Sequence, residues 1–65
     1  MATEIEVRTM HKAMLNTLLK LKRANDKKGV KVEGLATAIR DQRAIMLPED
    51  FAYVQKLVEE ADDED

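Results

Sequence analysis

The sequence predicts an all-α fold: a three-helix domain with one long N-terminal helix followed by two shorter helices. Apolar residues recur at intervals of three and four along most of the 65 residues, which is the helical period. The only strong helix breakers, Gly29, Gly34 and Pro48, divide the chain into three segments. No two segments alternate in the way that paired strands require. We therefore expect one helical domain over residues 1–61, which can assemble as a dimeric helical bundle.

The first helix is expected from Thr3 to about Asp26. The run Thr3-Glu4-Ile5-Glu6 fits a capping box, in which the threonine side chain and the glutamate side chain each bind the other's backbone amide. An apolar stripe follows, made of Val7, Met10, Met14, Leu18 and Leu21. Leu15 and Leu19 lie off this stripe, roughly 80–120° around the helix. The apolar surface is therefore wider than one neighbouring helix needs.

The second segment is predicted to be an extended connector followed by a short helix. Gly29 to Val32 alternates in polarity but has no strand to pair with, so we expect its two valines to cover the end of the core. The second helix is expected over about residues 33–46. Its core-facing side is predicted to consist of Leu35, Ala38, Ile39, Gln42, Ile45 and Met46.

The third helix is predicted to begin at Pro48, because proline is well tolerated at the first helical position. Met46 and Phe51 are spaced as a hydrophobic staple around this start. The apolar face of the helix is predicted to consist of Phe51, Val54, Leu57, Val58 and Ala61. Residues 62–65 have nothing to bury, and we expect them to form a disordered acidic tail.

Charge is distributed unevenly along the chain. Residues 1–43 hold ten Lys or Arg against five Asp or Glu, and residues 44–65 hold one Lys against eight acids. The densest basic stretch, called the basic segment below, contains Lys20, Lys22, Arg23, Lys27, Lys28 and Lys31. It is either a polyanion-binding patch or a solvated face that the acidic tail screens.

The composition argues against catalysis and metal binding. There is no Ser and no Cys, and His11 is the only histidine, so a Ser-His-Asp triad and a Cys-based zinc site are both excluded. No glycine-rich loop has the spacing of a phosphate cradle. We therefore expect no enzyme activity, no catalytic residues, no cofactor and no metal ion.

The sequence offers nothing that points to a membrane. It has no apolar run of 18 or more residues, and its start lacks the basic and apolar regions of a secretory signal. The expected location is the cytoplasm.

Two functions remain open after these exclusions. The first is binding and regulation of another protein, as an inhibitor, adaptor or assembly subunit. Its expected interface consists of Met10, Met14, Leu15 and Leu19, and exposed leucines on so small a domain also predict a homodimer. The dimer is expected to be antiparallel, because that arrangement separates the two basic segments. The alternative is an accessory protein that binds nucleic acid through the basic segment. Sequence-specific reading by the third helix is not expected, because Glu49 and Asp50 at its start would repel phosphates.

Overall fold

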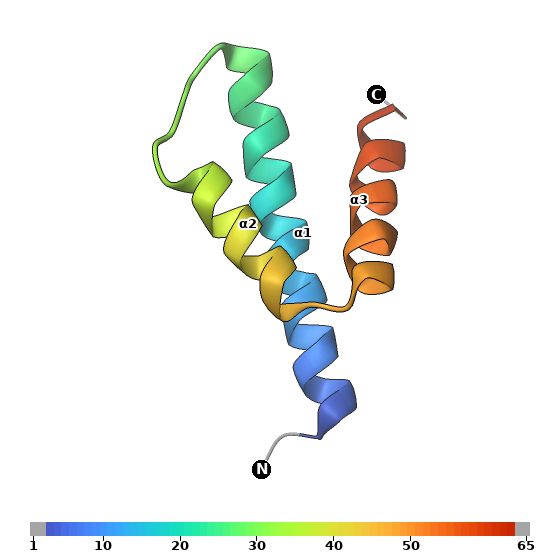
Figure 1. The fold of residues 1–65 in the computed structure, drawn as a ribbon. Coiled ribbons are helices and arrows are strands. Elements are labelled where there is room, and N and C mark those ends of the chain that lie inside the picture. The colour runs from blue at the N-terminus through green and yellow to red at the C-terminus, as the bar shows by residue number, and fades with distance from the viewer. Residues whose placement is uncertain (1–2, 64–65) are drawn as a thin grey trace.

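The computed structural model describes residues 3–63 and consists of three helices (Figure 1). They are α1 (Glu4–Lys28), α2 (Leu35–Ile45) and α3 (Pro48–Asp63). Helix α2 runs back along α1, and α3 then runs in the same direction as α1 on another side of it. Both shorter helices pack against α1, which is the central element of the domain. The predicted fold class, a long helix followed by two shorter ones, is confirmed.

Local signals determine both ends of α1. The Thr3 Oγ1 accepts a hydrogen bond from the Glu6 amide at 3.1 Å, and a Glu6 carboxylate oxygen accepts one from the Thr3 amide at 3.4 Å. The predicted capping box is therefore confirmed. The helix ends at Lys28, and Gly29 follows in the left-handed conformation with φ +72°. The amides of Gly29 and Val30 donate back to the carbonyls of the last turn, as in a Schellman motif.

The connector between α1 and α2 does not cover the core. Val30 and Val32 are both about half exposed, and neither belongs to the core cluster, so that part of the prediction is wrong. The chain turns into α2 at Gly34, whose φ of +86° is a conformation that glycine adopts without strain. Helix α2 consequently starts at Leu35, two residues later than expected.

Helix α3 starts where the sequence predicts but runs further. Pro48 is its first residue, and the acidic Glu49 and Asp50 occupy the first turn, where they favour the helix dipole. The helix continues to Asp63. Residues 62 and 63 are thus in its last turn and not in the disordered tail that we expected, while residues 64 and 65 lie outside the described part of the chain.

The core is small and lies where the three helices meet. Its buried side chains are Leu15, Met46, Val54 and Val58, and Leu19, Ile39 and Phe51 pack against them partly buried. The two members of the expected staple, Met46 and Phe51, both belong to this cluster. Leu15 has no exposed surface at all and is the most buried side chain of the cluster.

The expectation that α2 and α3 leave Leu15 and Leu19 uncovered is wrong. Both leucines face the two shorter helices, whereas the stripe residues Val7, Met10, Met14 and Leu21 stay exposed. The side of α1 that points inward carries Arg8 and Lys12 as well as the leucines. Because charged residues normally mark the solvent side of a helix, this side looks exposed in the sequence. Arg8 reaches α3 by an ion pair, and Lys12 lies against an aromatic ring of the same helix.

Candidate functional site

A row of exposed hydrophobic side chains follows one side of α1. It is formed by Val7, Met10, Met14 and Leu21, and we call it the α1 apolar face. Met10 and Met14, at its centre, are 59% and 53% exposed. The four residues recur at spacings of three, four and seven, so that they share one side of the helix. A continuous exposed apolar row of this kind is a feature of binding surfaces, whereas isolated exposed hydrophobic residues are ordinary.

Helix α2 widens this surface at one edge. A shallow groove of about 460 Å³ runs between α1 and α2 beside Met14, with Thr17, half-buried Leu18 and Ala38 in its walls. A second hollow, of about 400 Å³, is lined among others by Val7, His11 and Ile45. The sequence placed Ile45 on the core side of α2, but it is largely exposed at the end of that helix.

The predicted protein interface is therefore divided by the fold. Met10 and Met14 lie on the surface, where they could contact a partner, and that role stays a prediction. Leu15 and Leu19 belong to the core and are unavailable to a partner of the folded domain. On the surface, Val7 and Leu21 accompany the two methionines instead of the leucines. The periodicity grouped these four residues but did not show whether they face the core or the solvent.

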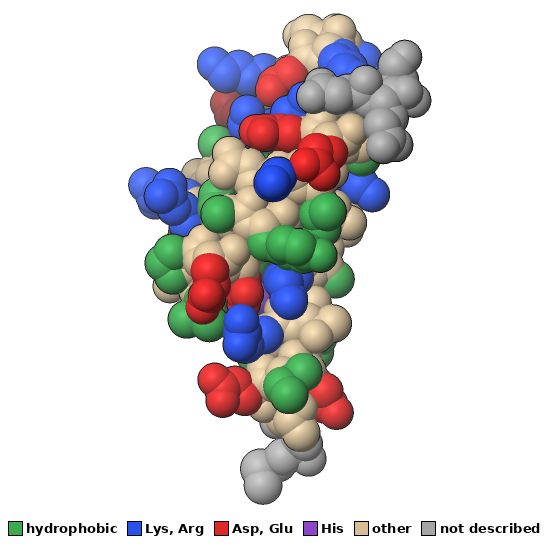
Figure 2. All heavy atoms as spheres, turned by 90° about the vertical axis from the view of Figure 1, so that its right-hand side faces the viewer, with side chains coloured by type: hydrophobic (Ala, Val, Ile, Leu, Met, Phe, Trp, Pro, Cys, Tyr) green, Lys and Arg blue, Asp and Glu red, His purple; other side chains and the backbone are tan. Residues whose placement is uncertain are grey.

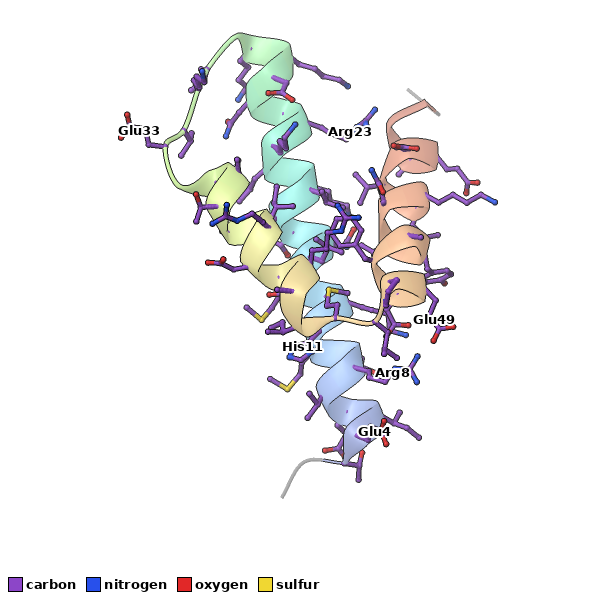
Figure 3. All side chains as sticks on the ribbon, in the orientation of Figure 1. Glu4, Arg8, His11, Arg23, Glu33 and Glu49 are labelled. Carbon is purple, nitrogen blue, oxygen red and sulfur yellow. The ribbon has the colours of Figure 1, made fainter. Side chains whose placement is uncertain are left out.

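Two polar contacts hold the shorter helices against α1, and periodicity alone gave no sign of either. Arg8 donates from Nε and Nη2 to the two carboxylate oxygens of Asp50, at 3.0 and 2.9 Å. Figure 3 shows Arg8 directed toward the start of α3. The hydrogen bond from Arg8 lowers the pKa of the buried Asp50 carboxyl, and the same contact raises the pKa of Arg8. Gln42 of α2, also buried, donates to the backbone carbonyl of His11 at 3.4 Å.

Cationic side chains also lie over both aromatic rings. Lys12 Nζ is 5.9 Å from the centre of the Tyr53 ring, and the Arg43 guanidinium is 5.2 Å from that of Phe51. Contacts at this distance are weakly attractive, and the aliphatic parts of both side chains cover apolar surface. These residues therefore take part in the packing of the helices.

The basic segment occupies the end of α1 and the loop that follows. Its lysines are exposed and Arg23 is half-buried. Lys22 forms an ion pair with Asp26 at 3.3 Å, and Arg23 and Lys27 each have an interaction partner as well. Because α3 runs parallel to α1, its acidic C-terminal end lies at the same end of the molecule (Figure 1). Figure 2 shows acidic and basic side chains intermixed there.

The described residues show no other arrangement with obvious chemistry. Within them, no three His, Asp or Glu side chains gather closely enough to hold a metal ion. No helix in residues 3–63 is both long and apolar enough to cross a bilayer. Comparison with known protein families, with characterised proteins and with solved structures finds no significant match.

Proposed function

We propose that this protein is a non-enzymatic helical interaction module, which binds and regulates another protein through the α1 apolar face. The observation that supports the proposal is the position of this face. Met10 and Met14 are more than half exposed on α1, outside the core cluster that Leu15 and Leu19 join. Binding of a partner would remove this apolar surface from water, which is the main favourable term in protein association.

The distribution of apolar side chains supports the same proposal. In the described part of the chain, eleven large hydrophobic side chains are exposed and four hydrophobic side chains are buried. Single exposed hydrophobic residues are common on soluble proteins, but here several of them line up on one helix. The two methionines at the centre of the row suit such a surface, because flexible thioether side chains adapt to the shape of a partner.

The test is a comparison of three forms of the protein in affinity purification from the native host. They are the wild type, a variant with Met10→Glu and Met14→Glu, and a control with Ala52→Glu and Gln55→Glu on the exposed side of α3. The two variants add the same charge at exposed sites. A partner retained by wild type and control, lost from the methionine variant and rebound by the purified wild type supports the proposal. Equal recovery by all three forms contradicts it.

Nucleic-acid binding is the second candidate function, and the exposed lysines of the basic segment favour it. The acidic end of α3 and the Lys22–Asp26 ion pair reduce the net positive charge at that site. Fluorescence anisotropy with random duplex and single-stranded oligonucleotides at two salt concentrations separates the candidates. Affinity that falls steeply with salt would indicate phosphate contacts. No binding at low salt would dismiss this function.

A further inference from the structure

We infer that the α1 apolar face binds a second copy of this chain, with the two α1 helices antiparallel and a two-fold axis at Met14. The inference rests on the proposed function, because it names the partner of the same surface. It differs from the dimer expected from the sequence, in which Leu15 and Leu19 formed the contact.

The spacing of the face is self-complementary about Met14. Val7 and Leu21 each lie seven residues from Met14. Met10 and Leu18, which is half-buried in the adjoining groove, each lie four residues from it. When one helix is reversed against its copy, Val7 of each chain therefore comes opposite Leu21 of the other. Met10 likewise comes opposite Leu18, and Met14 meets its own counterpart. A two-fold dimer requires this property, because the same surface must fit itself.

The charges at the two ends of α1 favour the antiparallel arrangement. The first turn carries Glu4 and Glu6, and the last turn carries Lys27 and Lys28. Figure 3 shows Glu4 and Arg23 toward opposite ends of the helix. Reversing one helix directs the acidic first turn of each copy toward the basic end of the other. A parallel pairing would instead place the two basic segments side by side, where like charges repel.

The surroundings of the face leave room for a second helix. Helices α2 and α3 cover the inward side of α1 that carries Leu15, so neither blocks access to Met14. From Val7 to Leu21 the face is about 21 Å long at the rise of an α-helix, roughly half of the 40 Å length of the molecule. The groove beside Met14 can receive side chains of the second copy in the way that ridges of one helix fill grooves of another.

The small core means that a permanent partner would add to the stability of this chain. Domains of this size rarely gain enough stability from a single core, and self-association is one of the usual remedies. In the described residues the buried hydrophobic side chains are Leu15, Met46, Val54 and Val58. A second copy is always present when the chain is made and would add the α1 apolar face to this core.

The first experiment is sedimentation equilibrium of the full chain from 1 to 100 µM. The wild type is expected to reach twice its 7.4 kDa mass. Met14→Glu places two like charges against each other at the axis and should raise the dissociation constant by about 100-fold or more. The control Ala52→Glu, which adds the same charge on an exposed part of α3, should leave it unchanged. Circular dichroism establishes that both variants keep the helical content of the wild type.

Cross-linking determines the direction of the helices, because the chain has no native cysteine. Val7→Cys and Leu21→Cys chains are mixed, labelled with different tags and treated with a short bis-maleimide. The antiparallel dimer gives mixed cross-links between the two variants and few between two Val7→Cys chains. Preferential linking of Val7→Cys to itself overturns the antiparallel arrangement.

The outcomes also separate this inference from the proposed function. A wild type that stays at 7.4 kDa up to 100 µM overturns the dimer. If the wild type is monomeric and binds a different protein, and the Met10→Glu and Met14→Glu variant does not bind that protein, only the identification of the partner as a second copy is wrong. If the wild type is monomeric and that variant loses no partner either, both proposals fail.

Discussion

Leu15 provides the sharpest test of the core. It has no exposed surface, and it lies against residues of both shorter helices. Leu15→Ala removes buried apolar atoms and leaves a cavity, a change that costs about 2–5 kcal/mol in protein cores. A single core of this size supplies about 3–5 kcal/mol. The substitution should therefore remove most or all of the stability of the domain.

Leu57→Ala on α3 is the matched control, because it is the same chemical change at a leucine that is 44% exposed and lies off the α1 apolar face. About half of that side chain is already in water, so the expected loss is about 1 kcal/mol, without a cavity. Urea unfolding followed by circular dichroism measures both losses, with sucrose or trimethylamine oxide added so that each variant has a folded baseline. Equal losses at the two positions would refute the placement of Leu15 at the centre of the core.

Three further predictions concern the pH dependence, the helix ends and the acidic end of α3. The pKa of Asp50 is lowered below 3.8 by Arg8, so the stability from this pair is complete above that pH and disappears as the pH falls through the folded value. Asp50→Asn should reduce the fall in urea midpoint between pH 6 and pH 3, and an unchanged fall would contradict the pairing. Gly29→Ala should destabilise the protein by about 1 kcal/mol in the same assay, because a side chain is strained at φ +72°; an unchanged midpoint would contradict that conformation. Glu59→Gln should delay elution from heparin more than Glu49→Gln, since α3 ends near the basic segment, and equal elution would show that the acidic end does not screen it.

The sequence by itself determined the helices and most of their ends. The capping box at Thr3, the proline at the start of α3 and the glycine after α1 each act within a few residues of chain. Such signals depend on neighbours along the backbone and can be read without knowledge of the fold. The end of α3 was predicted too early, because acidic composition was taken to end a helix that continues to Asp63.

Only the tertiary structure decided which side of α1 is buried. Both apolar rows of this helix satisfy the helical period, and the row that looked more continuous is the exposed one. Which side of α1 is buried depends on where α2 and α3 pack against it. Contacts between residues far apart in the sequence determine that packing. Arg8 and Asp50 are 42 positions apart, and Gln42 lies 31 positions from His11. A polar residue in a helical pattern normally marks the solvent side. Arg8 is an exception, because its carboxylate partner is distant in the sequence and comes close only when α3 packs against α1.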